Sequence, residues 1–312
     1  MPIGHGNMYS SIFPMRGQHN PTSRSIPASC EAAHRSRSAG CQTSSAQHAL
    51  VLLLASSCIV ASDKAAADSS FFDNFATFDQ KRWYVSDGWS NGDYQDCIWS
   101  LKNVRMGERK AELVLSDEPA RNRRYTCAEV RTRELFKYGT YEVRMRAAAG
   151  PGVVTAFFTY IGPPQGKPHD EIDFEFLGKN RRAVQLNYWV NGNGKHGRDI
   201  DFQFDASADM HNYAFEWKPD GIRWFVDGKL VHEVRSRDGE PLPSHPGAIH
   251  FMLWNGVGPD MESWLQKFEY PGQPITATFE HVAFTEFGRP CQFPASIVCA
   301  RTRVEGEMTR AL

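Results

Sequence analysis

Three acidic residues stand at every second position in the middle of the chain, in the run HDEIDFEFLG (169–178). Side chains two positions apart share a face in a β-strand but not in an α-helix. Glu171, Asp173 and Glu175 are therefore expected on one face of a strand, with alternating apolar residues on the other. A half-buried strand with a solvated outer face is the alternative, but like charges repel and acids are depleted in strands. The pattern therefore favours a chemical role for the three acids over a solvated strand face.

Two carboxyl groups are sufficient to break a glycosidic bond. One must be protonated, to give its proton to the leaving oxygen, and the other must be ionised, to attack the anomeric carbon or to activate water. On a strand, the Cα atoms of Glu171 and Glu175 lie about 13 Å apart, whereas the carboxyl groups of retaining enzymes lie about 5–5.5 Å apart. On a concave face the two side chains could lean toward each other and bring their carboxyl groups near that distance. The strand is therefore expected in a curved sheet. The charge of Asp173 raises the pKa of a neighbouring carboxyl, but the spacing does not say which glutamate is the acid.

The elements that must position this strand are nearly all strands as well. The run IRWFVDGKLVHEV (222–234) predicts a hairpin, because Asp227 and Gly228 supply the left-handed positions of a tight turn. Many short strands between turn residues predict an all-β sandwich, and no long amphipathic helix is evident. Alternation predicts further strands at 140–147, 183–190, 213–217 and 277–284.

The first 67 residues have the character of an export leader. Residues 1–47 are rich in Ser, Arg and His, and the apolar stretch 49–61 is too short to span a membrane comfortably. Small residues that end at Ala67 fit a signal-peptidase site before Asp68. We therefore predict a secreted or periplasmic protein that is cleaved near Ala67. The segment 1–47 is then either a disordered leader or the result of a start codon set too far upstream.

The chain after the leader is expected to form one domain. The full sequence has 312 residues, 23% charged and 41% hydrophobic, and its net charge of −1 does not indicate a nucleic-acid partner. No linker or repeat interrupts it. We predict a catalytic sandwich at 68–288 and a C-terminal extension at 289–312 that has a disulfide loop and a frayed tail. A monomer without a membrane span is expected.

The cysteine count supports cleavage of the leader. Three of the seven cysteines precede Ala67, and an even set of four remains. An even count in an exported domain suggests disulfides, and we predict the pairs Cys97–Cys127 and Cys291–Cys299. Four free thiols are the alternative, which is less common outside the cytosol.

The acidic run resembles the E-I/L/V-D-I/F/A/T-E signature of the family 16 glycoside hydrolases, which are retaining β-glucanases on a curved, concanavalin-like β-jelly roll with a concave substrate cleft. The resemblance covers most of 71–288. SNGDYQDCIW and YTCAEVRT are similar to the bacterial lichenase pattern, its disulfide included. CQFPASIVC resembles a narrower branch, the ExoK-type endo-1,3-1,4-β-glycanases that trim rhizobial exopolysaccharide. Further matches are AFFTYIGP, VQLNYWVNG, YAFEW, WFVDG and LWNG.

The resemblance implies a role for each acid. Glu171 is similar to the nucleophile, Glu175 to the general acid/base, and Asp173 to the middle acid that assists them. Aromatic side chains would carry sugar rings, and polar ones would bond hydroxyl groups. The alternatives are core packing for Phe158 and Tyr160, and a plain surface pair for Glu129 and Arg131. The positions implied for substrate binding are Asn91, Glu129, Arg131, Phe158, Tyr160, His169, Asn187, Trp189, Trp254 and Trp264.

Four positions depart from the lichenase pattern. His169 stands where lichenases carry Trp, Met252 where they carry Asn, and Trp189 where they carry Tyr. These changes put a strict preference for lichenan in doubt. Many relatives bind a structural calcium near the last strand, and Glu280 stands in place of Asp at the carboxylate position, so a calcium site is possible there. No cofactor is required for the predicted chemistry.

Six cations flank the acidic run within about thirty residues, and loops beside an active-site strand often rim the cleft. We hypothesise that they accept an anionic polymer such as succinoglycan; a solvated charge run is the alternative. The six are Lys167, Lys179, Arg181, Arg182, Lys195 and Arg198.

The pattern leads to one function and to rivals. The predicted protein is an endo-β-glucanase that hydrolyses a mixed-linkage β-1,3-1,4-glucan or a succinoglycan-like exopolysaccharide by retaining double displacement. A non-catalytic carbohydrate-binding jelly roll would bind glycan without cleaving it. A transglycosylase of the same family would pass the glycosyl unit to a sugar instead of water. A structural envelope protein would leave the acidic strand unexplained.

Overall fold

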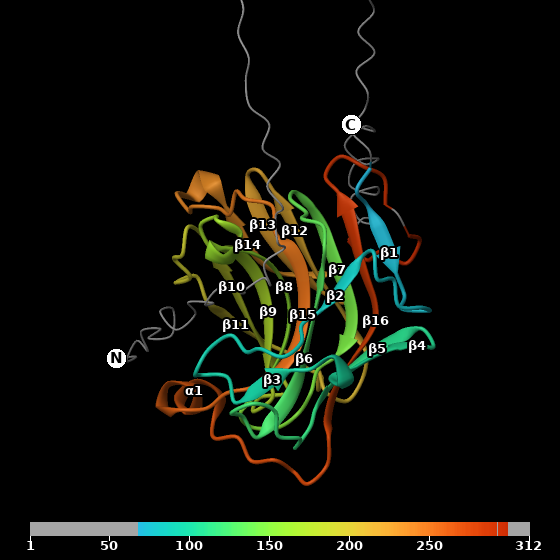
Figure 1. Ribbon diagram of the computed structural model, residues 1–312. Coiled ribbons are helices and arrows are strands. Elements are labelled where there is room, and N and C mark those ends of the chain that lie inside the picture. Colours follow the sequence, from blue (N-terminus) through green and yellow to red (C-terminus); the bar gives the residue numbers. More distant parts are fainter. Residues whose placement is uncertain (1–67, 292, 299–312) are drawn as a thin grey trace, which may run out of the picture. The chain divides into compact units, whose positions relative to one another are not determined.

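Two β-sheets lie face to face in the computed structural model, which describes residues 68–291 and 293–298 (Figure 1). One, here called sheet A, has eight strands. Across it run β14 (Lys229–Arg235), β13 (Gly221–Val226), β12 (His211–Lys218), β7 (Gly139–Arg146), β16 (Ile275–Glu286), β5 (Lys110–Leu115) and β4 (Val104–Gly107), with β1 (Phe71–Asp73) on β16.

The other, sheet B, also has eight strands and contains the acidic run. All strand pairs in both sheets are antiparallel except that of β3 with β6. Across sheet B run β11 (Arg198–Asp201), β10 (Ala183–Trp189), β9 (Asp170–Leu177), β8 (Val153–Ile161), β15 (Ala248–Asn255), β6 (Tyr125–Thr132) and β2 (Trp83–Val85), with β3 (Cys97–Trp99) on β6.

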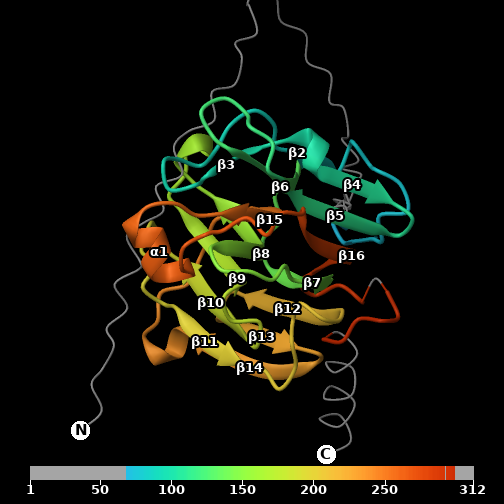
Figure 2. The ribbon, with the colours of Figure 1, turned by 90° about the horizontal axis from the view of Figure 1, so that it is seen from below.

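The described part of the chain contains little helix. One α-helix, α1 (Pro259–Leu265), follows β15, and three short 3₁₀ turns are η1 (Leu101–Asn103), η2 (Pro163–Gln165) and η3 (Ser236–Asp238). Seen from below, the two sheets form separate layers, and α1 lies beside sheet B (Figure 2). The prediction of an all-β sandwich is confirmed.

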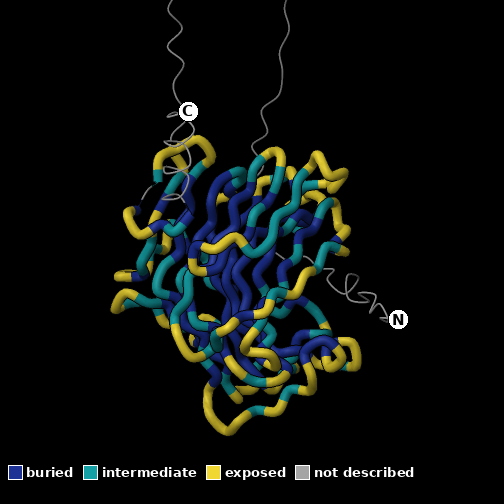
Figure 3. The backbone as a smooth tube through the Cα atoms, turned by 180° about the vertical axis from the view of Figure 1, so that it is seen from behind, coloured by how far each residue is buried: buried dark blue, intermediate teal, exposed yellow. Residues whose placement is uncertain are grey.

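The core lies between the inner faces of the sheets. Phe174 of β9 packs against Phe215 and Tyr213 of β12, with ring centroids 6.3 and 5.7 Å apart. Phe251 of β15 meets Phe279 of β16 at 4.7 Å. The strands at the centre of the molecule are buried, while exposed residues gather in the loops (Figure 3). Burial of large aromatic side chains is the main stabilising term for such a sandwich.

The strands predicted from alternation are present. The predicted strands at 140–147, 183–190, 213–217 and 277–284 correspond to β7, β10, β12 and β16. The predicted hairpin is β13 and β14, and Asp227 and Gly228 both have positive φ, at 46° and 75°. That geometry suits the twist of a two-residue hairpin.

One predicted disulfide is confirmed, and the other lies partly outside the described residues. Cys97 and Cys127 are bonded at 1.99 Å, which ties β3 to β6. Cys291 is also disulfide-bonded, but its predicted partner Cys299 lies outside the described residues. So do the leader and signal peptide (1–67) and the tail 301–312. Among the residues that are described, no helix has the length and apolar character that crossing a bilayer requires.

The beginning of the C-terminal extension packs on the outer face of sheet A. Glu142 of β7 is buried there, and its carboxylate accepts hydrogen bonds from Ser296 Oγ at 2.6 Å and from the backbone N–H of Ile297 at 3.1 Å. Val298 packs against Phe225 of β13. The outer face of sheet B is the face that carries the acids.

Candidate active site

The three acids of the central run lie on one face of β9, as alternation predicts. The inward side chains of the strand belong to the core, and the acids face away from it. Each acid has a neighbour on both adjoining strands. Glu171 lies opposite Tyr160 and Trp189, Asp173 opposite Phe158 and Asn187, and Glu175 opposite Ala156 and Gln185.

The same face continues across the next two strands. The pairing of β8 with β15 sets His250 opposite Phe158, and the pairing of β15 with β6 sets Arg131 opposite His250 and Glu129 opposite Met252. Phe158 and Tyr160 therefore share the face of the acids and do not point between the sheets. Seven of the ten positions implied for substrate binding lie on this face, in strands β6, β8, β10 and β15: Glu129, Arg131, Phe158, Tyr160, Asn187, Trp189 and Trp254.

Burial and mutual repulsion differentiate the acids. Asp173 is only 2% exposed, and burial together with the charges of Glu171 and Glu175 holds its pKa well above the ordinary value. Burial, and then the charge of Glu171, raises the pKa of Glu175 to about 8. Within the described residues, none of the three acids pairs with Lys or Arg. The pKa of Glu175 lies above neutral pH, so Glu175 holds a proton beside the charge of Glu171, and the pKa of Asp173 is shifted in the same direction.

Glu171 lies in an aromatic corner. His169 Nε2 is 2.5 Å from Glu171 Oε2. The imidazole stacks on Trp189, with centroids 4.4 Å apart and planes 14° apart, and meets the edge of Tyr160 at 5.1 Å. Burial and the charge of Glu171 both raise the pKa of Tyr160, so the phenol stays neutral.

Asp170 fixes the start of β9. Its carboxylate accepts hydrogen bonds from the backbone N–H groups of Asn191 at 2.9 Å, Ser244 at 2.8 Å and His245 at 3.0 Å, and His245 Nδ1 lies 2.8 Å away. Burial alone would raise the pKa of this carboxyl, but the hydrogen bonds hold it below its ordinary value. Two loops are thereby tied to the acidic strand.

Sheet A also contacts the acidic strand through the core. The indole Nε1 of Trp224, on β13, donates to the backbone carbonyl of Asp173 at 3.2 Å. A buried carbonyl needs a partner, and this one fixes the depth of β9 at its middle acid.

Glu129 and Arg131 form a polar group on β6, the strand that pairs with β15. Glu129 is 1% exposed, accepts a hydrogen bond from Ser86 Oγ at 2.5 Å, and lies 3.7 Å from His250 Nδ1. Burial opposes ionisation of Glu129, but His250, Ser86 and Arg131 hold its pKa below the ordinary value. The guanidinium of Arg131 lies 4.4 Å above the ring of Tyr84. These contacts make the pair part of a buried network, not a plain surface pair.

A pocket adjoins the Glu175 end of the face. Trp264 of α1 donates from Nε1 to Gln185 Oε1 at 3.0 Å, and Gln185 lies opposite Glu175. A pocket of about 310 Å³ opens beside them, lined also by Lys179 and Asp199. Its amide, indole and carboxylate groups match the hydrogen-bonding needs of sugar hydroxyls.

Two predicted positions lie toward the loop that contains residues 86–96. Asn91 is buried there, and its side-chain oxygen accepts a hydrogen bond from Trp99 Nε1 at 3.4 Å. Trp254 is buried near the end of β15, where it meets the edge of Tyr94 at 5.8 Å. Sugar binding by these two residues stays a prediction.

Sequence reasoning missed His250, Gln185 and Ser86. His250 stacks on Phe158 at 4.8 Å and lies beside Glu129. The signal for it was present, because His250, Met252 and Trp254 alternate with apolar residues as the acids do. Gln185 alternates in the same way on β10. Ser86 carries no such signal, because it lies beyond the end of a short strand.

The flanking cations lie in the segments around β9, β10 and β11. Arg181 pairs with Asp205 at 3.1 Å, and Arg182 donates to the Gln203 carbonyl at 3.1 Å. Lys179 Nζ donates to the Trp264 carbonyl. Lys167, Lys195 and Arg198 are exposed.

The carboxylate predicted to lie near a calcium ion forms an ion pair with an arginine side chain. Glu280 Oε2 lies 2.5 Å from Arg144 Nε. In the part of the chain that is described, no group of three or more His, Cys, Asp or Glu side chains is placed to hold a metal. The Glu280 side chain does not favour calcium, although calcium also accepts backbone oxygens. A calcium site there stays a prediction.

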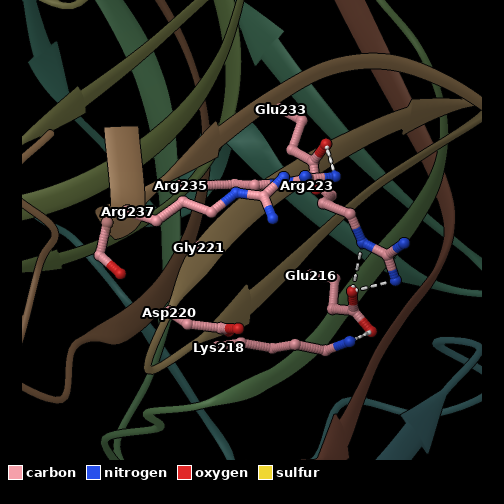
Figure 4. Close-up of a pocket in the computed structure, with 9 residues that line it drawn as sticks. Glu216, Lys218, Asp220, Gly221, Arg223, Glu233, Arg235 and Arg237 are labelled. Carbon is pink, nitrogen blue, oxygen red and sulfur yellow. Dashed lines mark hydrogen bonds and ion pairs between the residues drawn. The ribbon is translucent and has the colours of Figure 1, made fainter. Parts of the chain in front are cut away.

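A second cluster of charges lies on the outer face of sheet A, around a pocket of about 290 Å³ (Figure 4). Glu216 is 6% exposed and pairs with Lys218 Nζ at 2.9 Å and with Arg223 Nε at 2.7 Å. Glu233 pairs with Arg235 at 2.5 Å. Each of these two acids has its own cation, unlike the acids of β9.

Comparisons with known proteins agree with this geometry. Residues 91–272 match the family described as glycosyl hydrolases family 16. The chain is 43% identical over 239 residues to the endo-1,3-1,4-beta-glycanase ExoK of Rhizobium meliloti (strain 1021), a match that covers 76% of this chain and 87% of that protein. It is 41% identical over 231 residues to a beta-glucanase of Bacillus subtilis (strain 168), covering 73% and 91%.

Solved structures give the same result. A lichenase derived from a mouse hindgut metagenome superimposes with a TM-score of 0.65 at 41% identity, covering 70% of this chain and 99% of that one. The beta-glucanase of Bacillus licheniformis gives a TM-score of 0.65 at 39% identity, with the same coverage. The sandwich is thus the jelly roll of these enzymes, and the chain belongs to glycosyl hydrolase family 16 and is a glycoside hydrolase.

Proposed function

We propose that the protein is an endo-β-glucanase that hydrolyses internal β-glucosidic bonds by retaining double displacement. The observation that carries this proposal is the contrast between two glutamates on one strand. The pKa of Glu175 is raised to about 8 by burial and by the charge of Glu171. At neutral pH one site therefore offers a proton and the other a carboxylate, which are the two groups that glycoside hydrolysis needs.

The proposed reaction begins with proton transfer from Glu175 to the glycosidic oxygen, whose bond to the anomeric carbon breaks. A carboxylate oxygen of Glu171 attacks that carbon and forms a glycosyl-enzyme. Glu175, now ionised, takes a proton from water, whose oxygen displaces Glu171 from the sugar. Asp173 holds a proton beside Glu171, and a hydrogen bond joins the two side chains. No cofactor takes part.

The remaining residues of the face are proposed to bind the polymer. Trp189 and Phe158 lie beside the acids, but they are 5% and 1% exposed and stack on His169 and His250, so they shape the floor of the site and offer a sugar little ring area. Glu129, Arg131 and Asn187 offer directional partners for hydroxyl groups. The side-chain oxygen of Asn187 is buried without a hydrogen-bond partner, as expected for a group that a ligand completes.

The proposed substrate is a mixed-linkage β-1,3-1,4-glucan or a succinoglycan-like exopolysaccharide. The names of the relatives, beta-glucanase and endo-1,3-1,4-beta-glycanase, support the linkage. The exposed cations Lys167, Lys195 and Arg198 near the acidic strand support an anionic polymer. Export as a monomer through the leader at 1–67 is part of the proposal.

The test is reducing-end release by the purified protein on lichenan and on succinoglycan, side by side. Release from either polymer with falling chain length supports the endo-glucanase. Binding to both without cleavage would favour the carbohydrate-binding jelly roll. Products longer than the starting oligosaccharide would favour a transglycosylase. Salt dependence of KM on succinoglycan alone would support the cationic contribution.

A further inference from the structure

The imidazole of His169 touches the carboxylate that is proposed to attack the sugar. Nε2 lies 2.5 Å from Glu171 Oε2. An ionised carboxylate only accepts hydrogen bonds, so the proton of this contact is on Nε2. A hydrogen bond to a charged group is about twice as strong as one between neutral groups, so the contact is able to fix the side chain of Glu171.

The ring of His169 is itself held in one orientation. One face stacks on Trp189 with planes 14° apart, and Tyr160 meets the ring at 64°. The backbone carbonyl of His169 accepts the N–H of Gly192 at 2.8 Å. Gly194 also lies so close that an added Cβ would come within 2.2 Å of the Trp189 ring. The Trp189 ring on which the imidazole stacks is therefore itself held by close packing against Gly194. A positioning group needs such support.

The alternative role is a platform on which a sugar ring stacks. His169 is 8% exposed, and one face of its ring is already occupied by Trp189. Little ring area is left for a sugar. The polar edge of the imidazole, in contrast, points at Glu171.

We propose that His169 is a positioning residue that holds Oε2 of the nucleophile Glu171 through an Nε2–H hydrogen bond. This inference rests on the proposed function of Glu171. It assigns to His169 a role that an apolar aromatic ring at the same position could not fill, because such a ring has no donor for a carboxylate.

Other titratable groups face this contact from β9 and from the elements packed against it. Asp173 and Glu175 face Glu171 from the same strand, and burial together with the charge of Glu171 raises the pKa of each. Tyr160 and Tyr94 approach from β8 and from the loop before β3, and both phenols have raised pKa values, chiefly through burial. The imidazole of His169 is the nitrogen donor that contacts Glu171.

Two substitutions separate positioning from stacking. His169→Phe keeps the stacked ring and removes the donor, whereas His169→Gln keeps an N–H near Nε2 and removes the ring. We expect His169→Phe to lower kcat about 10-fold to 100-fold with KM within about twofold, and to move the acidic limb of the kcat/KM profile to higher pH by about 1 unit. His169→Gln is expected to recover most of kcat and to leave the acidic limb nearly unchanged. The reverse ranking, with KM raised in His169→Gln and kcat preserved in His169→Phe, would overturn the proposal.

A spectroscopic measurement tests the contact without any turnover. The Nε2 proton of His169 is expected as a downfield imidazole N–H signal in proton NMR of the full chain, lost in Glu171→Ala. The signal of His245, whose Nδ1 lies 2.8 Å from Asp170, must persist in that variant as the internal control. Persistence of both signals would overturn the contact. Loss of the His169 signal in a chain that cleaves no glucan would reject the proposed function and leave the hydrogen bond standing.

Discussion

Two charge clusters, one on the outer face of each sheet, differ in how their acids are partnered. On sheet A, the buried acid Glu216 is paired with Lys218 and Arg223. On sheet B, Asp173 and Glu175 have no such pair, and burial together with the charge of a neighbouring acid raises the pKa of each. Both faces follow from strand alternation, so alternation alone does not distinguish them.

The difference shows what an acid in a strand costs and what it offers. The charge of a paired acid is neutralised by its cation, and a buried pair adds little net stability once the burial of both charges is counted. An unpaired, buried acid has a strongly shifted pKa, which is unfavourable for folding but useful for proton transfer. The cluster of three acids on sheet B is therefore the reactive one, and the cluster around Glu216 serves as its control. Glu142, another buried acid of sheet A, is covered by the C-terminal segment, where Ser296 and Ile297 donate to it.

The largest expected effect is on turnover. Glu171→Gln and Glu175→Gln should each lower kcat on lichenan by about 10³-fold or more, because each removes a group that acts in the transition state. The matched control on sheet A, Glu216→Gln, should leave kcat unchanged. Circular dichroism must show all three variants folded. Wild-type activity in either β9 variant would end the assignment.

The next effect is on pH dependence. Glu175 must be protonated to act as the acid, and burial and Glu171 raise its pKa to about 8. The rate should therefore fall about tenfold per pH unit above pH 8, in kcat/KM profiles measured from pH 5 to pH 10. A flat profile through pH 9 would contradict a protonated Glu175.

The same shift predicts a change in stability. The folded protein keeps the Glu175 proton up to about pH 8, while the unfolded chain releases it near the ordinary value of 4.5. The unfolded state thus binds fewer protons in this window, so the free energy of unfolding contributed by Glu175 falls as pH rises from about 4.5 to about 8. Glu175→Gln should therefore gain stability relative to the wild type across that window in urea melts. Parallel curves for the two proteins would refute the raised pKa.

A smaller effect concerns how β6 is held on the reactive face. The Cys97–Cys127 bond spans 30 residues and ties β3 to β6, the strand that carries Glu129. Replacing both cysteines by Ser should lower the free energy of unfolding by about 3–4 kcal/mol in the chain-entropy account. Denaturant melts with and without reductant check this, since the variant should no longer respond to reduction at this bond.

The smallest effect belongs to the cluster around Glu216. Arg223→Ala removes one of the two cations from the buried carboxylate of Glu216 and leaves Lys218 in place, so the free energy of unfolding should fall by about 1–3 kcal/mol, with turnover unaffected. Urea melts at two salt concentrations measure it. A large loss of activity would mean that the two faces are coupled and that the comparison does not hold.

Much of this organisation could be predicted from short sequence patterns. The face shared by Glu171, Asp173 and Glu175 follows from alternation alone, and the β13–β14 turn follows from Asp227 and Gly228. Both depend on residues that are neighbours in the sequence, for which backbone geometry leaves few choices.

What could not be predicted depends on register between distant strands. His250 meets Glu129 only because β15 pairs with β6, and Trp224 reaches the Asp173 carbonyl only because sheet A packs behind β9. The raised pKa of Glu175 also depends on the burial of its side chain, which residue spacing does not reveal. Burial and these contacts are set by the pairing of distant strands.

The central claim is that Glu171 is the nucleophile and Glu175 the acid, and chemical rescue by azide tests it most directly. Glu171→Ala, with an activated aryl β-glucoside, is predicted to give an α-glycosyl azide, because azide enters from the face that the carboxylate has left. Glu175→Ala is predicted to give the β-glycosyl azide, because Glu171 still forms the glycosyl-enzyme. The opposite pair of anomers, read by NMR, would exchange the two roles and contradict the account.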